Sequence, residues 1–495
     1  MTRDQAVLAT LIVYKLLLVL IGVLMQRRTR DHVDFFLGGR KLGPLVAAVS
    51  ASASSSSAWT LLGVSGAAYA WGLSALWLFP ACVGGFLLNW YVLARPLQNL
   101  SHQNGAVTVT EVLAGPVARP ERPLIATVAS LIILVSLVTY VASQFQGAGK
   151  AFNETFGISL LESVLLGAAI VLFYTLLGGF WAVSVTDTLQ GLLMAISAIL
   201  LPAGALIAVG GVDGLMTGLS RVPADGYLSP TRNLSPVLAV GFVLSLLGIG
   251  FGYPGQPHVV NRFMALRKGE GALKRARRIA MVWAVVVYAG MLLLGLCGRI
   301  LFPDLLDSEV VFISAANQLF HPIVSGIIIA AVLSAIMSTA DSQLLVAASS
   351  ITYDLKFGDL APDGGGPLSG YPLRGRGSVL LRSRLVVVLI SLGAVVIALV
   401  GSQRIFSQVL FAWTAMGAAF GPLLLITVLK GPVSSGRTLA AMIAGFSLSV
   451  LAYSFPETRG GVLERVLPFI VAFAIILLHP SISLKKLINP GTKEP

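Results

Sequence analysis

The chain has 495 residues, of which 56% are hydrophobic and only 11% are charged, and its mean hydropathy is +0.87. These proportions exclude an ordinary soluble protein and predict that lipid surrounds most of the chain. The formal net charge of +13 does not indicate nucleic-acid binding, because the Lys and Arg residues lie in short connectors rather than on one face of a polar domain.

Apolar stretches of about 20 residues, long enough to cross a hydrocarbon core roughly 30 Å thick, recur along the whole chain. We therefore predict an all-α integral membrane protein with about thirteen transmembrane helices. The predicted spans are residues 6–26, 44–72, 74–94, 123–151, 158–178, 180–210, 235–262, 275–301, 309–355, 380–401, 405–430, 437–455 and 462–480. The first span has no basic leader and no small-residue cleavage site, so we expect it to be retained.

The connectors predict the orientation, because cytoplasmic connectors carry the excess of Lys and Arg. Connectors after odd-numbered spans hold the basic residues Arg27, Arg28, Arg30, Arg119, Arg122, Arg262, Arg267, Lys268, Lys274, Arg275, Arg277, Arg278, Arg374, Arg376, Arg382 and Arg384. Connectors after even-numbered spans are short or carry acids such as Asp304, Asp307 and Glu309. We expect an N-terminus outside the cell, a cytoplasmic C-terminus, and residence in the cell inner (plasma) membrane.

The second span carries the sequence SASASSSSAW at residues 50–59, which places a run of Ser in an otherwise apolar helix. Serine hydroxyls can bond to the preceding turn and weaken the helical backbone, and unwound carbonyls at membrane depth persist only where they line a cavity or bind an ion. This segment is predicted to be a broken helix.

The seventh span carries LLGIGFGYPGQPH at residues 246–258, whose Gly and Pro residues also prevent a regular helix. Five spans separate the two breaks, so the broken helices cross the membrane in opposite directions, as an inverted repeat of five plus five helices requires. The alternative is that these small residues only allow close helix packing.

This reading divides the chain into five parts. Residues 1–43 hold the first helix and a cytoplasmic loop, and residues 44–211 hold the first five-helix repeat. An extracellular loop is expected at 212–234, followed by the second repeat at 235–430, which includes a Gly- and Pro-rich flexible loop at 356–379. Two peripheral helices and a cytoplasmic tail complete the chain at 431–495.

The ninth span places Ala335, Ser338, Asp341 and Ser342 at helical spacing on one face. Sodium is a hard cation that favours oxygen ligands, and the hydroxyls of Ser338 and Thr339 facing the break of the second span could hold it.

Buried carboxylates are costly in a membrane, so Asp187 and Asp341 are candidates for a cation vestibule. The alternatives are a helix-end carboxylate in interfacial water for Asp187 and a structural hydrogen bond for Asp341. Trp59, Tyr140 and Tyr253 could shape a solute pocket, although a single aromatic residue of this kind is more often a packing residue.

Six colinear motifs are carried by these segments: FLGGRKLGP (36–44), SASASSSSAW (50–59), GGFWAVSVTDTLQG (178–191), GYPGQPHVVNRFMA (252–265), MSTADSQLL (337–345) and GAAFGP (417–422). Together they resemble the sodium:solute symporter family, and most closely its sodium/proline symporters. The resemblance implies a leucine-transporter-like core of ten helices with one extra helix in front and two behind. It also implies sodium as the coupling ion.

The resemblance further implies the site residues. Backbone carbonyls of Ala53, Ser56 and Ala335 with the hydroxyls of Ser338 and Thr339 would form the main sodium site. A second sodium site would use Asp187, Asp341 and Ser342 with Ser338, a solute pocket would use Ser54, Ser57, Trp59, Tyr140 and Tyr253, and Arg40 would take part in sodium coupling.

Two positions depart from the pattern of the proline symporters: Ser55 stands where an acidic residue is typical, and Ile249 where a tryptophan is typical. Proline is the leading solute, with another amino acid, a monocarboxylate or sialic acid as alternatives. The rival classes of protein are a transporter-like membrane sensor, a passive channel and a membrane enzyme. We expect that the protein is not an enzyme, because no nucleophile with a nearby base stands out. Neither a nucleic-acid partner nor an obligate protein partner is expected.

Overall fold

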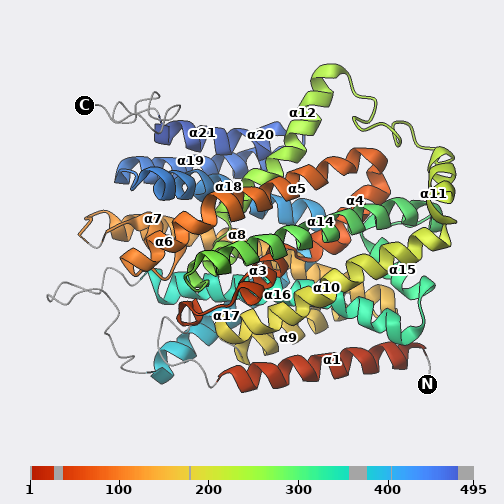
Figure 1. Ribbon diagram of the computed structural model, residues 1–495, viewed down its shortest axis with the longest axis horizontal. Coiled ribbons are helices and arrows are strands. Elements are labelled where there is room, and N and C mark those ends of the chain that lie inside the picture. Colours follow the sequence, from red (N-terminus) through yellow and green to blue (C-terminus); the bar gives the residue numbers. More distant parts are fainter. Residues whose placement is uncertain are drawn as a thin grey trace.

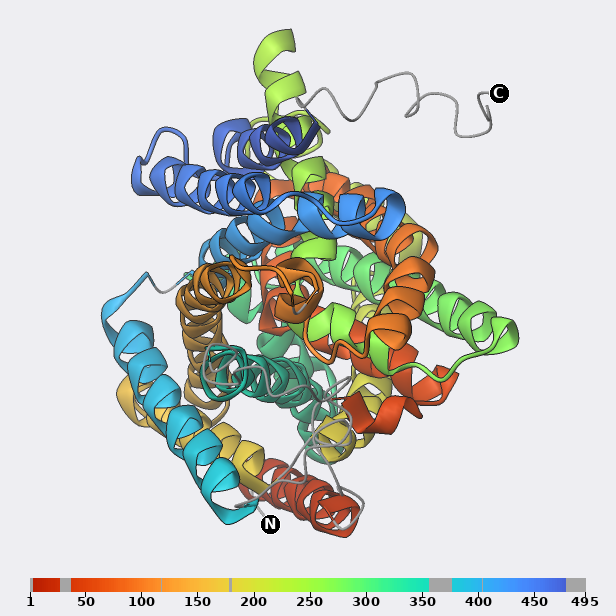
Figure 2. The same cartoon turned by 90° about the vertical axis from the view of Figure 1, so that its left-hand side faces the viewer.

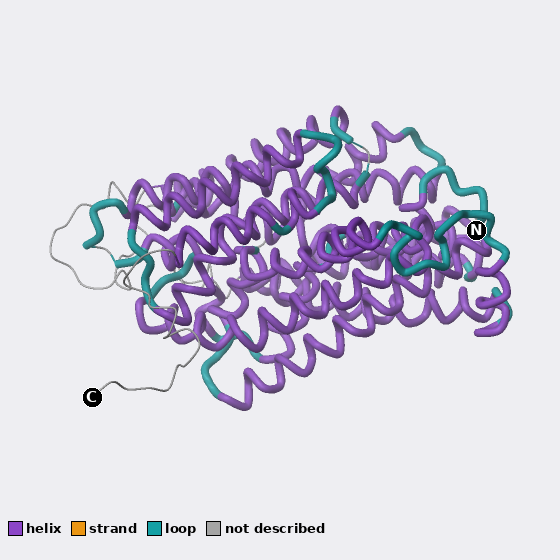
Figure 3. Tube along the Cα trace, turned by 90° about the horizontal axis from the view of Figure 1, so that it is seen from above, coloured by secondary structure: helices purple, strands orange, loops and turns teal. Residues whose placement is uncertain are grey.

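The computed structural model describes residues 3–26, 37–116, 118–177, 180–355, 376–402 and 404–477. Over these residues the secondary structure is helical, with no β-strand beyond an isolated bridge between Leu42 and Leu266 (Figure 3). Ten helical segments in the described ranges are long and apolar enough to cross a membrane. The predicted all-α membrane class is therefore confirmed, whereas the count of thirteen spans is not. The 356–375 part of the predicted flexible loop and residues 478–495 of the predicted tail lie outside the described residues.

The helices follow one another along the chain with few long connectors. They are α1 (Arg3–Gln26), η1 (Gly38–Arg40), α3 (Pro44–Ser55), η2 (Trp59–Gly63), α4 (Val64–Trp71), η3 (Gly72–Trp77), α5 (Leu78–Leu87), η4 (Leu88–Leu93), α6 (Ala94–Asn104), α7 (Val109–Ala114), α8 (Arg122–Phe156), α9 (Leu160–Leu177), α10 (Phe180–Ala208), α11 (Gly211–Ser220), α12 (Pro236–Leu247), η5 (Gly248–Gly255), α13 (Pro257–Ala265), α14 (Glu270–Leu301), η6 (Ser308–Val310), α15 (Val311–Leu319), α16 (Pro322–Thr352), α17 (Arg376–Val400), α18 (Ile405–Lys430), α19 (Ser435–Ser454), α20 (Val462–Arg465) and α21 (Leu467–Leu477).

Several predicted elements differ from the structure. Residues 376–379, predicted as part of the flexible loop, begin α17, and the predicted span 462–480 is divided into α20 and α21 over its described part. The predicted span 309–355 is divided into η6, α15 and α16, because Phe320 is extended and Pro322 starts a new helix at its first turn. The predicted loop 212–234 overlaps the amphipathic helix α11. In each of these cases apolar content alone could not locate the helix ends.

Long helices lie side by side, with α1 on one side of the bundle and α19 and α21 on the opposite side (Figures 1 and 2). Burial separates the core from the periphery, since 94% of the most apolar window of α18 and 83% of that of α16 are buried, against 22% for α1. The polar residues of α16 therefore lie inside the protein.

Both predicted breaks are present. Helix α3 ends at Ser55, and Ser56 has φ −115° and ψ 83° before the chain resumes a helix with a π-helical turn at Trp59. In the other segment, η5 separates α12 from α13, and Gln256 is extended with φ −99° and ψ 97°. Such interruptions in an apolar helix leave backbone groups available for other partners.

The two broken helices meet at one end of the bundle. The Leu42 N–H donates to the Ala265 carbonyl at 3.1 Å, and the Arg267 N–H donates to the Leu42 carbonyl at 3.0 Å. Because α3 begins where α13 ends, the two helices run in opposite directions from this point, as the spacing of the breaks predicted. The division into two five-helix repeats remains a prediction.

Candidate ion and solute site

The oxygens of the first break face helix α16. The Ser338 hydroxyl lies 3.4 Å from the Ala53 carbonyl and 3.3 Å from the Ala335 carbonyl. The Thr339 hydroxyl lies 3.5 Å from the Ala53 carbonyl and 3.2 Å from that of Ser54. These residues are fully buried, and Ser56 lies in the break itself. Carbonyl and hydroxyl oxygens gathered in this way match the ligands that a hard cation prefers.

A second polar cluster adjoins the first. One oxygen of Asp187 accepts hydrogen bonds from Ser50 at 2.8 Å and from Ser54 at 3.4 Å. The Ser342 hydroxyl lies 2.9 Å from that of Ser54 and donates to Asp341 at 3.4 Å. The residues predicted for a second sodium site are thus brought together, and Ser54, predicted for the solute pocket, also contacts this cluster.

Arg262 stands at the centre of the second cluster. Its guanidinium donates to Asp187 at 3.0 Å and to Ser342 at 2.6 Å, and its Nε donates to Ser50 at 3.1 Å. The prediction that Arg262 lies in a cytoplasmic connector was wrong, because α13 continues to Ala265 and the side chain is only 1% exposed. The interfacial-water alternative for Asp187 also fails, since this carboxylate is completely buried and ion-paired.

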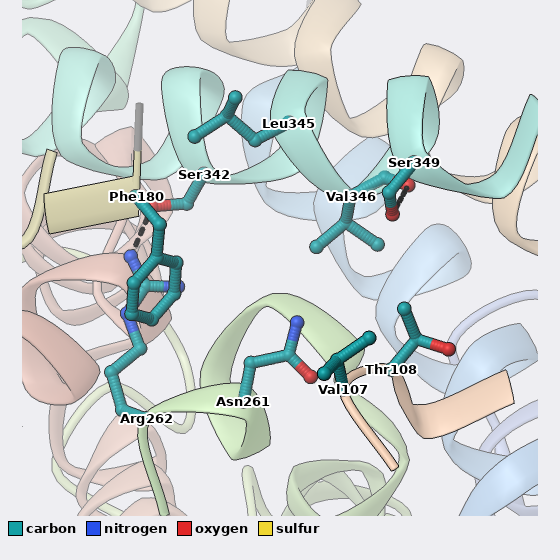
Figure 4. Close-up of a pocket in the computed structure, with 9 residues that line it drawn as sticks. All are labelled: Val107, Thr108, Phe180, Asn261, Arg262, Ser342, Leu345, Val346 and Ser349. Carbon is teal, nitrogen blue, oxygen red and sulfur yellow. Dashed lines mark hydrogen bonds between the residues drawn. The ribbon is translucent and has the colours of Figure 1, made fainter. Parts of the chain in front are cut away.

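A narrow cavity lies beside this cluster, toward the end of the bundle where α3 begins. Figure 4 shows Arg262 and Ser342 on one side of it and Thr108 on the other. Its volume is about 20 Å³, which is room for about one water molecule and not for a solute. The ring of Phe180 lies 5.0 Å from the Arg262 guanidinium and covers it. A solute therefore does not fit into this cavity beside the cluster.

Aromatic side chains surround the other side of the first break. The Tyr140 hydroxyl donates to the Ser57 hydroxyl at 3.3 Å, and the Ser57 hydroxyl oxygen accepts the backbone N–H of Trp59 at 3.1 Å. The rings of Tyr253 and Trp413 meet edge to face at 4.7 Å, and Trp413 lies 6.5 Å from Tyr140. Ser57 therefore contacts both Tyr140 and Trp59. Tyr253 is linked to Tyr140 through the ring of Trp413.

Trp413 is a site residue that sequence reasoning missed. Its indole N–H donates to the Ile249 carbonyl at 3.1 Å, at the position where a proline symporter would have a tryptophan. Trp413 reaches the break because α18 lies directly against η5: a Cβ added to Gly417 would come within 2.5 Å of the Gly252 Cα. The glycines around GAAFGP were the available signal for this close approach.

Arg40 lies apart from both clusters. It follows two glycines with positive φ and itself has a φ of 56°, in the turn that precedes α3. Its guanidinium donates to the Ser101 hydroxyl at 2.5 Å and to the Ala106 carbonyl at 2.9 Å. It therefore ties the start of α3 to the end of α6 rather than contacting the ion ligands.

Comparisons with known proteins agree with this geometry. Residues 35–445 match the sodium:solute symporter family. The sodium/proline symporter of Escherichia coli (strain K12) is 33% identical over 98% of this chain and 96% of its own length. The high-affinity proline transporter PutP of Bacillus subtilis (strain 168) is 34% identical over 93% of this chain and 94% of its own length.

Solved structures agree on the fold. A substrate-bound, outward-open Na⁺-coupled sialic acid symporter superimposes with a TM-score of 0.76 at 19% identity, over 96% of this chain and 98% of that one. Mhp1, a nucleobase-cation-symport-1 family transporter, gives a TM-score of 0.56 at 13% identity, over 94% of this chain and 96% of that one. The predicted leucine-transporter-like fold is thereby confirmed. The protein is an integral membrane transporter and belongs to the sodium:solute symporter family.

Proposed function

We propose that this protein takes up proline together with sodium across the cell inner (plasma) membrane. The observation that carries the proposal is the convergence of the Ser338 and Thr339 hydroxyls on the Ala53 carbonyl at the break of the second span. An ion held there touches both α16 and the broken helix. Its binding would fix the position of Ser57 and Trp59, which follow the break directly.

Coupling then needs no covalent chemistry, and we expect the protein not to be an enzyme. If sodium tightens solute binding by fixing the break, the solute must tighten sodium binding by the same factor. Inward movement of one positive charge contributes about 2.3 kcal/mol per 100 mV of membrane potential. This inward movement of sodium drives the uptake of the solute. The proposed orientation has the N-terminus outside and the C-terminus in the cytoplasm, as the basic connectors predicted. No obligate protein partner is part of the proposal.

The solute assignment draws on the relatives and on the aromatic pocket. The two curated relatives compared are proline transporters by name. The proposed site is rich in aromatic rings, and the Trp59 indole N–H has no hydrogen-bond partner among the described residues, so it is free to donate to a solute carboxylate. Sialic acid, the solute of the structural neighbour, is the second candidate, because Ser55 and Ile249 depart from the proline-symporter pattern.

One sodium ion per solute is the proposed stoichiometry. The Arg262 guanidinium already neutralises Asp187 and bonds to Ser342, two of the residues predicted for a second ion. A second cation would have to displace a buried guanidinium from its carboxylate.

Uptake by purified protein in liposomes tests the proposal. Radiolabelled proline should accumulate when sodium is high outside, and replacing sodium with potassium should abolish accumulation. Unlabelled sialic acid, other amino acids and monocarboxylates serve as competitors. Accumulation that ignores the sodium gradient would refute symport, and sodium-driven accumulation of labelled sialic acid without accumulation of labelled proline would refute the solute assignment.

A further inference from the structure

A large cavity opens at the end of the bundle opposite the bridge between Leu42 and Leu266. Its volume is about 750 Å³, and its walls come from α4, α12, η6, the start of α18 and the segment 453–465. This size is typical of ligand pockets. Phe406 lines the cavity, and its ring lies 5.6 Å from that of Trp59 and 5.0 Å from that of Trp71. The cavity therefore ends at the aromatic residues of the proposed solute site.

Arginine dominates the charge of this cavity. Arg232, Arg404, Arg459 and Arg465 line it together with three acids, Asp307, Glu309 and Glu464. Within the described residues, none of the four guanidinium groups forms an ion pair within 4.0 Å of a carboxylate.

The acids of the cavity already have other partners. The Lys150 ammonium lies 2.5 Å from Glu309 and 2.6 Å from Asp307. Glu309 also accepts the N–H groups of Ile405 and Phe406, at 3.1 Å and 2.8 Å. Glu464 accepts the Gly460 N–H at 2.5 Å. Glu464 also attracts Arg465 and Arg459 electrostatically, but without an ion pair within 4.0 Å in the described residues, so the guanidinium groups can still bind an anion from outside the chain.

Arg465 provides the sharpest indication. Its side chain is only 7% exposed, yet its Nε donates to no acceptor in the part of the chain that the structure describes. A buried guanidinium nitrogen without a hydrogen bond is costly unless a ligand completes it. The position also adjoins the second break, because a Cβ added to Gly248 at the start of η5 would lie 3.2 Å from the Arg465 carbonyl.

We propose that this cavity is an outer binding site for the carboxylate of the solute, held by Arg465 and Arg404 before the solute passes Phe406. The guanidinium fork matches a carboxylate with two parallel hydrogen bonds. The hydroxyls of Ser245, Ser402 and Ser407 also line the cavity and can contact the remaining part of the solute. The identity of the solute rests on the proposed function, but the requirement for a carboxylate does not.

A cysteine reporter in the full-length protein tests the site. Ser407→Cys places a thiol in the cavity wall, whereas the native Cys82 and Cys297 are buried. The variant is placed in bilayers of zwitterionic lipid and labelled with a small anionic thiol reagent in sodium-free buffer. Proline, acetate or prolinamide, which lacks the carboxylate, is added at equal ionic strength, set with chloride.

Proline and acetate should slow labelling by about threefold at ~2 times their dissociation constant, as mass action requires, whereas prolinamide should not. Arg404→Gln, at an exposed position, should remove this protection, and Arg465→Gln should do the same if its thermal unfolding is unchanged. Arg221→Gln, an exposed arginine at the end of α11 that does not line the cavity, is the matched control.

Equal protection by prolinamide or by chloride alone would overturn the site, and so would protection that survives Arg404→Gln. Anionic lipid that blocks labelling in place of the carboxylates would assign the arginines to a headgroup and also overturn it. The two proposals fail separately. Arginine-dependent protection without sodium-driven proline uptake keeps the outer site and rejects the solute, whereas uptake without protection rejects the outer site alone.

Discussion

The Arg262 guanidinium lies 3.0 Å from the Asp187 carboxylate, and both side chains are buried in the middle of the helical bundle. Removing one partner of such a pair leaves an uncompensated charge, which costs about 3–5 kcal/mol. We expect Asp187→Asn and Arg262→Gln each to lower the thermal unfolding midpoint strongly, and the double variant to recover part of the loss. A double variant whose loss equals the sum of the single losses would show that the two side chains do not interact.

Sodium dependence should respond to the hydroxyls of α16. Thr339→Ala removes an oxygen that lies 3.2 Å from the Ser54 carbonyl. The lost contact between sodium and the hydroxyl oxygen is comparable with a hydrogen bond to a charged group, about 1.5–3 kcal/mol, so the sodium concentration for half-maximal uptake should rise about tenfold or more. Ser350→Ala on the same helix is the control, because its hydroxyl donates only to the Val346 carbonyl one turn back, at 3.1 Å. An equal effect of both variants would show that Thr339 is not a ligand of the sodium ion.

The contact between α18 and η5 should not tolerate one added methyl group. In Gly417→Ala the new Cβ would lie 2.5 Å from the Gly252 Cα, where only backbone can yield. Overpacking costs about 1–3 kcal/mol, and displacement of Trp413 should also reduce uptake. Gly436→Ala on α19 meets nothing within 4 Å and should be neutral or stabilising. Thermal unfolding and uptake, measured on both variants, decide the matter, and a neutral Gly417→Ala would contradict this packing.

A pH dependence should arise at the end of the bundle where α16 stops. Burial, and then the neighbouring Glu111, raise the pKa of Asp354 from 3.8 to about 7, although the carboxylate accepts a hydrogen bond from Thr108 at 2.9 Å. The folded protein therefore binds a proton that the unfolded chain releases between these values. Stability from this group is present at low pH and is lost as pH rises toward 7.

Asp354→Asn should flatten this part of the stability profile. The thermal unfolding midpoint, measured from acidic to neutral pH, is the readout, and Asp213→Asn on the exposed surface of α11 is the control. An unchanged slope in Asp354→Asn would mean that another group causes the dependence.

The breaks, and the shared helical face of Ser338 and Ala335, could be predicted because their cause is local. Consecutive serines before Trp59 and the Gly and Pro residues around Tyr253 weaken a helix wherever it lies, and helical spacing alone placed Ser338 with Ala335. Tertiary contacts had no such signal. Arg262 follows an apolar stretch and resembles an ordinary flanking charge, and its partner Asp187 is 75 positions away.

The same limit applies to the solute region and to the helix count. Trp413 reaches the break only through the packing of α18 on η5, which no local pattern encodes. The partners of Glu309 come from α8 and α18, so its burial could not be foreseen from its place in an acidic connector. Continuous apolar content hid the end of α15 and the start of α16, where Pro322 was the one usable signal.

The most direct test of the account is the mutual dependence of sodium and solute at equilibrium. In detergent-purified protein, the affinity for proline should rise with sodium, the affinity for sodium should rise with proline by the same factor, and Thr339→Ala should weaken both effects. Proline affinity that is identical with and without sodium, in protein that remains folded, would contradict an ion site built on the broken helix beside the solute.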